Sequence, residues 1–221
     1  MIPETPPFPA LKARALLFDM DGTLVDSTAV VEGLWTDFAR QHGIDIGELL
    51  DYSHGRQTLD TLRRFLPGSP GDLARLAAEL EAREVDRVEG IIEIPGAGAF
   101  LQQLGNVPHA VVTSAGRTLA ETRLRAAGLP VPEVLVAAED VIAGKPSPEG
   151  YLQAAAELGI DISDCVVFED APAGLQSAVN SGAATVVVGT HESPLTRRLP
   201  RIKNYRGLRY AGGFVTGADV P

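Results

Sequence analysis

Two aspartates separated by a single residue, Asp19 and Asp21, follow directly on the apolar run at 16–18. Such a run is typical of a strand buried on both faces, and side chains two apart on a strand point to the same side. Two carboxylates a few ångströms apart in a poorly hydrated site repel each other strongly, so we expect a cation between them. Gly22 permits the sharp turn by which the chain leaves the strand.

Polar side chains also follow later apolar runs of the sequence. The runs at 110–114, 133–137, 165–169 and 184–189 have the length and composition of buried strands. In an open parallel sheet, ligands bind outside the carboxyl ends of the strands, where the connecting loops diverge. We therefore expect a group of side chains from four loops to converge at one edge of the sheet. Its members are Asp19, Asp21, Thr113, Ser114, Lys145, Glu169 and Asp170.

The chemistry of this group favours phosphoryl transfer. Four carboxylates, two hydroxyls and a lysine, without histidine or thiol, favour a hard cation with oxygen ligands, of which Mg²⁺ is the simplest choice. Such a metal keeps coordination positions for water and for substrate phosphate. An ionised aspartate can attack phosphorus, and a second carboxyl two residues further on can protonate the departing alcohol. The Thr113 hydroxyl, backbone donors and Lys145 would bind the transferring oxygens.

The elements that must position these residues form an α/β pattern. Apolar spacing predicts crossover helices at 119–127, 151–158 and 175–179 between the strands, and hence a doubly wound, Rossmann-like parallel sheet. The segment 28–89 is instead helical and strand-free, with Ser27 as a candidate helix cap and Gly43 as a candidate stop. Three helices are legible there, at 30–38, 59–66 and 73–88. We predict a core domain formed by residues 1–26 and 91–221, and an inserted small helical cap domain formed by residues 27–90.

The length and the net charge of the chain limit the classes of partner that we expect. The chain of 221 residues has a net charge of −10 and no apolar stretch close to the length of about 20 residues that a membrane helix needs. Nucleic acid and anionic membranes demand a basic surface, so we expect neither as a partner. Cys165 is the only cysteine, which indicates a core residue in a cytoplasmic protein. We expect a monomer acting on a small phosphate ester, with a Pro-rich arm at 1–10.

Four segments, in order, resemble the motifs of the haloacid dehalogenase superfamily phosphatases: DMDGTLVDS, VVTSA, GKPSPEGY and VFEDAPAG. The resemblance spans about residues 14–190. It implies that Asp19 is the nucleophile, Asp21 the general acid and base, Thr113 a phosphate ligand and Lys145 a charge neutraliser. It also implies a Mg²⁺ site, which would use Asp19, the main-chain carbonyl of Asp21, and Asp170 with Glu169 beside it. The helical insert is similar to the small cap of the first subclass.

Three further stretches, HGRQTLDTLRRF, VEGIIEIPGA and TSAG, resemble the sugar and polyol phosphatases, which include 2-deoxyglucose-6-phosphatase and glycerol-phosphatase types. The resemblance implies that Arg56 points into the cleft from the cap and helps to choose the leaving group, although a surface arginine at a helix start fits the same pattern. His54 is a second candidate for binding substrate, or a structural hydrogen-bond donor. Ser114 could reach substrate oxygens or cap the next helix.

Three other functions compete with hydrolysis of a phosphate monoester. A sugar phosphomutase of the β-phosphoglucomutase type would share every core residue, but HGRQTLDTL departs from the cap loop of such enzymes. A dehalogenase needs the first aspartate but neither Asp21 nor magnesium. A non-enzymatic binding module on the same fold is expected to have lost one of the acids or Lys145, and the sequence retains them all. We therefore expect hydrolysis.

Overall fold

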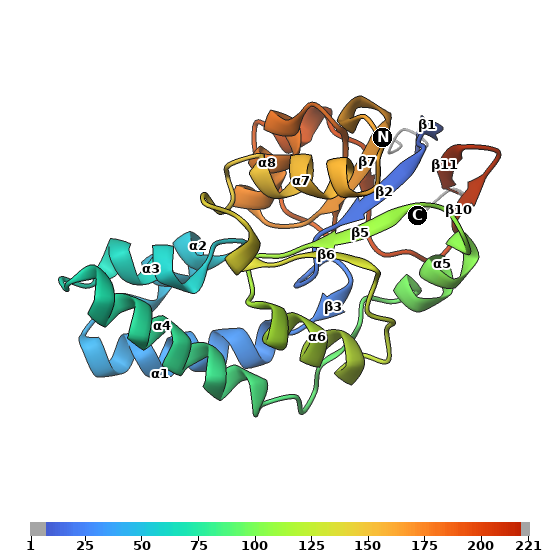
Figure 1. Cartoon of the computed structure of the whole chain (residues 1–221). Helices are drawn as coiled ribbons and strands as arrows, with labels where there is room; N and C mark the ends of the chain where they lie inside the picture. Colours follow the sequence, from blue (N-terminus) through green and yellow to red (C-terminus); the bar gives the residue numbers. More distant parts are fainter. Residues whose placement is uncertain (1–7, 218–221) are drawn as a thin grey trace, which may run out of the picture.

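A parallel sheet of six strands forms the centre of the computed structural model, which describes residues 8–217 (Figure 1). The strand order is β6-β5-β2-β7-β8-β9, and every neighbouring pair runs parallel. The strands are β2 (Ala15–Phe18), β5 (His109–Val112), β6 (Val134–Val136), β7 (Cys165–Glu169), β8 (Ala184–Val188) and β9 (Arg201–Ile202). This order confirms the doubly wound α/β prediction. Most of the Pro-rich arm, residues 1–7, lies outside the described residues.

Helices cover both faces of this sheet, because the apolar side chains of β2 point alternately to one face and to the other. Leu16 and Phe18 face the layer that contains α5 (Ala97–Leu104) and α6 (Arg117–Ala126). Ala15 and Leu17 face the opposite layer. That second layer consists of α7 (Glu149–Glu157) and α8 (Pro172–Ser181). Because β2 is buried on both faces, its sequence is a continuous apolar run, and the first polar residue stands at its carboxyl end.

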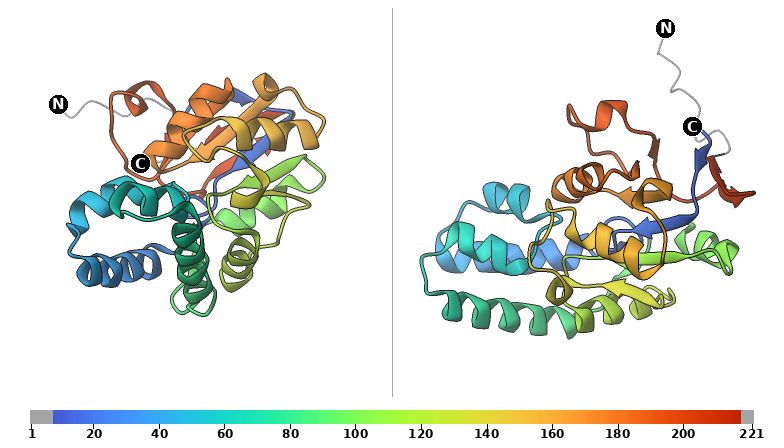
Figure 2. Two further views of the ribbon diagram at one scale, coloured as in Figure 1. Left: turned by 60° about the vertical axis from the view of Figure 1, so that its left-hand side comes forward. Right: turned by 45° about the horizontal axis from the view of Figure 1, so that its top comes forward.

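The segment between the first strand and the rest of the sheet is helical. Helices α1 (Thr28–His42), α2 (Ile46–Ser53), α3 (Thr58–Phe65) and α4 (Pro70–Val85) pack around an apolar cluster of their own, which includes Trp35, Phe38 and Leu62. Both turned views show them gathered at one end of the sheet (Figure 2). The treatment of 27–90 as a separate cap domain stays a prediction.

The two ends of the helical segment lie side by side. Strands β3 (Val25–Asp26) and β4 (Ile92–Glu93) pair antiparallel there, so that the chain leaves and rejoins the sheet layer at one place. The sequence does not predict this ribbon, because strands of two residues are too short to show an alternation of apolar and polar side chains. Neither was the small antiparallel sheet of β1 (Leu11–Lys12), β11 (Phe214–Gly217) and β10 (Leu208–Ala211). Between residues 8 and 217, no helix has the length and apolarity needed to span a bilayer.

Candidate active site

The carboxyl ends of β2 and β7 bring Asp19 and Asp170 together. The two strands pair in register, and the Asp19 backbone N–H donates to the Phe168 carbonyl at 3.0 Å. The turn beyond them requires glycine: Gly22 has a φ of +80°, and a Cβ there would lie 2.1 Å from Asp170 Oδ2. Thr23, on the same turn, donates to Asp170 Oδ1 at 2.9 Å. The turn thus both makes room for the Asp170 carboxylate and orients it.

Three carboxylates form a cluster at this edge of the sheet. One oxygen from each of Asp19, Glu169 and Asp170 lies within 4.8 Å of the others. Burial raises the pKa of Asp19 to about 8, although Lys145 opposes the rise, and burial together with Glu169 and Asp19 raises the pKa of Asp170. Lys145 is the one cation bonded to this cluster among the described residues, and it does not offset the burial and mutual repulsion of the three carboxyl groups. A set of oxygen ligands whose negative charge is not offset fits a hard divalent cation such as the predicted Mg²⁺.

Lys145 enters the cluster from the loop after β6, as the sequence predicted. Its Nζ donates to Asp19 Oδ1 and, at 2.7 Å, to Glu169 Oε1, and the side chain is only 5% exposed. Burial acts to lower the pKa of Lys145, but Asp19 and Glu169 outweigh it and raise the pKa. The ammonium group therefore stays charged at the foot of the site.

Glu169 is the most enclosed member of the cluster. Its side chain has no exposed surface, and it accepts hydrogen bonds from Lys145, from the Tyr151 hydroxyl at 3.3 Å and from the Ala171 N–H at 2.9 Å. A Cβ at Gly174 would lie 1.5 Å from Glu169 Oε1, so helix α8 must have glycine there. Because hydrogen-bond donors of the protein already bind the Glu169 carboxylate, its role as a metal ligand stays a prediction.

The two hydroxyl residues after β5 also reach this edge. Thr113 borders the same cavity as Asp19, and its Oγ1 accepts from the Ala115 N–H at 3.1 Å. Ser114 donates to the Gly55 carbonyl at 3.0 Å and so connects the sheet to the helical insert. It does not cap the following helix, where the N–H of the first residue, Arg117, donates to the Glu139 carboxylate at 3.0 Å.

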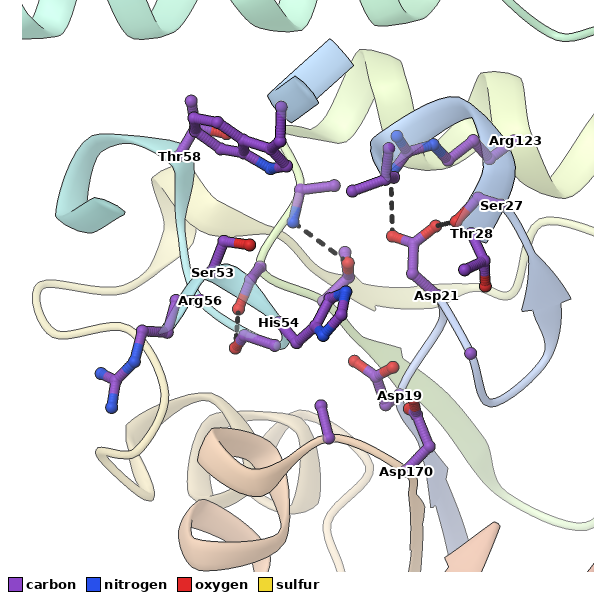
Figure 3. Close-up of a pocket in the computed structure, with 18 of the residues that line it drawn as sticks. Asp19, Asp21, Ser27, Thr28, Ser53, His54, Arg56, Thr58, Arg123 and Asp170 are labelled. Atoms are coloured by element: carbon purple, nitrogen blue, oxygen red, sulfur yellow. Dashed lines mark hydrogen bonds and ion pairs between the residues drawn. The ribbon is translucent and has the colours of Figure 1, made fainter. Parts of the chain in front are cut away.

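Asp21 lies apart from the acidic cluster and has a cation of its own. Its Oδ2 accepts from Arg123 at 2.9 Å, and its Oδ1 accepts from the Ser27 hydroxyl at 2.5 Å. Figure 3 shows this carboxylate turned toward Arg123 and Ser27 and away from Asp19 and Asp170. The structure thus pairs Asp19 with Lys145 and Asp21 with Arg123, where we had expected one cation between the two aspartates. Ser27 precedes α1 as expected, but its side chain makes no capping hydrogen bond.

Arg123 and its second partner, Glu84, are functional candidates that sequence reasoning missed. Arg123 on α6 donates to Glu84 on α4, and the two side chains are 4% and 7% exposed. A signal did exist, because each charged residue occupies the buried stripe of its helix. The buried residues of α4 are Leu73, Ala77, Leu80 and Glu84, and those of α6 are Leu119, Ala120, Arg123 and Leu124. A charged residue at such a position is rarely buried unless it is paired.

A cavity of about 300 Å³ lies above the acidic cluster, between the sheet edge and the helical insert. Trp35 and Leu119 are among its apolar lining residues, and Asp19, Asp21 and Thr113 among its polar ones. The residues that line it from the helical insert are Ser27, Thr28, Val31, Trp35, Ser53, His54, Gly55, Arg56, Thr58 and Glu84. A cavity of this volume can hold a small organic molecule next to the carboxylates.

The two candidate substrate-binding residues of the insert both border this cavity. The Arg56 guanidinium, however, lies over the Tyr52 ring at 4.5 Å from its centroid, and Figure 3 shows it extending away from the carboxylates. His54 Nε2 lies 4.0 Å from a carboxylate oxygen of Glu32. That either residue binds substrate stays a prediction.

Comparisons with known proteins show similarity over most of the chain. A family model described as haloacid dehalogenase-like hydrolase matches residues 13–182. Hexitol phosphatase A of Escherichia coli is 44% identical over 181 residues, which is 80% of this chain and 84% of that protein. Glycerol-1-phosphate phosphohydrolase 2 of Saccharomyces cerevisiae is 32% identical, over 82% of this chain and 76% of that protein. A β-phosphoglucomutase structure from Clostridium difficile superposes with a TM-score of 0.77 at 22% identity, over 87% of this chain and 91% of that one.

Proposed function

The chain belongs to the haloacid dehalogenase-like hydrolases, and from this premise we propose that it hydrolyses a small sugar or polyol phosphate monoester through an aspartyl phosphate on Asp19. The observation that carries the proposal is the convergence of Asp19 and Asp170 at the floor of one cavity, with Lys145 bonded to Asp19. The substrate class is supported by relatives whose names are hexitol phosphatase and glycerol-1-phosphate phosphohydrolase. The cavity gives a leaving group of that size a place to bind.

In the first step, an Asp19 carboxylate oxygen attacks phosphorus while the bond from phosphorus to the ester oxygen breaks. Asp21 gives its proton to the departing alkoxide, which leaves as a neutral alcohol. In the second step, water attacks the aspartyl phosphate, Asp21 takes up the proton of that water, and inorganic phosphate leaves with Asp19 regenerated. The Thr113 hydroxyl and the Lys145 ammonium stabilise the charge on the transferring oxygens.

Mg²⁺ completes this proposal. Asp19 and Asp170 would hold it, with the main-chain carbonyl of Asp21, and Glu169 beside them. A bound divalent cation lowers the pKa values of its carboxylate ligands and neutralises the charge of the phosphate. The raised pKa of Asp19 supports this need, because the nucleophile must be ionised to attack. Lys145 supplies the only ammonium or guanidinium bonded to Asp19 among the described residues.

The proposal is tested by measuring phosphate release from a panel of monoesters, with and without Mg²⁺. The panel contains a hexitol phosphate, glycerol 1-phosphate, a hexose 6-phosphate and a hexose 1-phosphate. We expect Mg²⁺-dependent release from at least one polyol or sugar ester, and none from the Asp19→Asn variant, whose fold should persist. Full activity in Asp19→Asn contradicts the proposal.

The same panel separates the phosphatase from a phosphomutase. Structural similarity to a β-phosphoglucomutase at 22% identity concerns the fold alone. A mutase would convert the hexose 1-phosphate into the isomeric ester, with little free phosphate. A phosphatase releases phosphate and forms no isomer, and this is the result we expect.

A further inference from the structure

The side of the cavity away from the acidic cluster contains a buried ion pair. Arg123 and Glu84 both border the cavity, and their side chains are 4% and 7% exposed. Figure 3 shows Arg123 beyond Asp21, on the side away from Asp19 and Asp170. A leaving group that extends across the cavity from a phosphate at the acidic cluster therefore meets this ion pair.

Glu84 keeps one oxygen available to the cavity. Its Oε2 accepts from Arg123, whereas no hydrogen bond to its Oε1 occurs among the described residues. This oxygen is not enclosed either, because the enclosed side-chain polar atoms that lack a partner in that part of the chain are Arg123 Nε and the Tyr205 hydroxyl. A carboxylate oxygen is an acceptor only, so the group that it can bind in a ligand is a hydrogen-bond donor such as a hydroxyl.

The two arginines that border the cavity have no positive charge to spare for a ligand. The Arg123 guanidinium is shared by two carboxylates, those of Asp21 at 2.9 Å and of Glu84. The Arg56 guanidinium lies over the Tyr52 ring, 4.5 Å from its centroid, and extends away from the carboxylates. An anionic leaving group would thus approach a carboxylate whose cation is already shared, and like charges in a poorly hydrated site repel strongly.

We propose that Glu84 is a specificity-determining residue, whose carboxylate accepts a hydrogen bond from a hydroxyl of the leaving group and excludes leaving groups that carry a negative charge. Arg123 keeps this carboxylate at the cavity wall. The inference rests on the proposed function and narrows it to esters whose leaving group is neutral and bears hydroxyls. Carboxylate-bearing esters and sugar bisphosphates would be rejected.

Pairs of esters that differ at a single carbon test this inference. Glycerol 1-phosphate and 3-phosphoglycerate have the same skeleton, and the hydroxymethyl group of the first is a carboxylate in the second. Glucitol 6-phosphate and 6-phosphogluconate form the corresponding longer pair. Propyl phosphate has the skeleton of glycerol 1-phosphate without its free hydroxyls, and so reports on hydrogen bonding alone.

The wild-type protein provides the first test, in whichever pair it hydrolyses faster. The assay is run at saturating Mg²⁺ and about pH 8, above the pKa of about 7 to which burial raises Glu84. We expect kcat/KM for the polyol ester to exceed that for its carboxylate counterpart by on the order of 100-fold or more. Equal values of kcat/KM for the two members overturn the inference, and this result needs no variant.

Two substitutions separate the charge of Glu84 from its role as an acceptor. Glu84→Gln keeps a carbonyl oxygen but no charge, so the preference for the polyol ester over the carboxylate ester should fall about tenfold or more. Glu84→Met removes both, and we expect kcat/KM for the polyol ester to fall roughly 10- to 100-fold, as for the loss of a hydrogen bond to a charged group. For propyl phosphate, which has no hydroxyl to donate, kcat/KM should change less than about threefold.

A control on the same helix isolates the effect of position. Glu79→Gln also removes a charge from α4, but from a side chain that is 48% exposed and bonded to Arg75, and it should leave every ratio unchanged. The thermal midpoint of each variant shows whether it is folded at the assay temperature. If neither Glu84 variant is folded, the wild-type ratio decides.

The outcomes distinguish the inference from the proposed function. Glu84 variants that slow the polyol, carboxylate and propyl esters alike have a structural defect only, and this result overturns the inference while the proposed function stands. A wild-type protein that releases phosphate from none of these esters overturns the proposed function, and the inference with it.

Discussion

Replacing Glu84 by glutamine is expected to change how the free energy of unfolding depends on pH. Burial raises the pKa of Glu84 from its ordinary value of 4.5 to about 7, although Arg123 opposes the rise. Repulsion from Asp21 and Glu81 adds to it. Between these two pKa values the folded protein holds a proton on Glu84 that the unfolded chain has lost.

The sign and size of the effect follow from proton linkage. Since the unfolded chain binds fewer protons in this window, the free energy of unfolding falls as the pH rises from about 4.5 to about 7. Each unit of pKa difference corresponds to about 1.4 kcal/mol, so Glu84 removes about 3 kcal/mol of stability across the window. The glutamine side chain has no proton to lose over this range. Relative to the wild type, Glu84→Gln should therefore gain about 3 kcal/mol between about pH 4.5 and pH 8.

Urea unfolding at about pH 5 and pH 8, analysed by linear extrapolation, measures this difference. Glu79→Gln is the matched control, because Glu79 lies on the same helix, is 48% exposed and is bonded to the exposed Arg75. Its stability difference from the wild type should stay constant within about 0.5 kcal/mol at the two pH values.

The opposite sign would refute the reasoning. If Arg123 outweighed burial, the pKa of Glu84 would lie below 4.5. Glu84→Gln would then lose stability relative to the wild type as the pH rises. A difference independent of pH would show that Glu84 is ionised to the same extent in the folded and unfolded states.

Two further substitutions test the floor of the site. Gly174→Ala places a Cβ 1.5 Å from Glu169 Oε1. We expect urea unfolding to show a loss of about 3 kcal/mol in the free energy of unfolding. We also expect a loss of phosphatase activity, because a displaced Glu169 no longer holds Lys145. Addition of Mg²⁺ to the EDTA-treated protein should raise the thermal midpoint, since three buried or half-buried carboxylates gain a counter-charge. In Asp170→Asn that rise should be much smaller, and an unchanged rise would remove Asp170 from the metal site.

Much of the site could be predicted because parallel strands end at a common edge. Asp19 and Asp170 follow strands that are neighbours in the sheet, although most of the chain separates them in sequence. The apolar runs that precede them are buried on both faces and are therefore legible without any partner being known. Once those strands are recognised, the convergence of their terminal residues follows from topology alone.

Arg123 and Glu84 could not be placed in the same way. Leu73, Ala77 and Leu80 mark the buried stripe of α4, and Glu84 continues it by one turn. The sequence therefore carries a sign that this glutamate is buried, but none that names its partner on α6, 39 residues away. Whether a charge at a stripe position is tolerated depends on that partner, which only the docking of the two helices provides.

Short elements were missed for a different reason. Helix α2 begins at the Asp45 cap, which accepts from the Glu48 N–H at 2.9 Å, but among its apolar residues only Leu49 is fully buried. Eight residues with one buried apolar side chain do not establish a helical period. Its packing against the other helices of the insert stabilises it, and this tertiary contribution is invisible in local sequence.

The distribution of charge explains why the site fits both a divalent cation and a phosphate monoester. Lys145 offsets one carboxylate of the acidic cluster, such as Glu169 at 2.7 Å, whereas Arg123 is shared by Asp21 and Glu84 outside the cluster. Asp19 and Asp170 then remain with no cation of their own among the described residues, apart from the Lys145 ammonium that Asp19 shares with Glu169. Two carboxylates in excess match the charge of one Mg²⁺ ion. Exchanging Lys145 or Arg123 for a neutral residue would add to this excess, so the two cations are needed to set the charge of the site as well as its geometry.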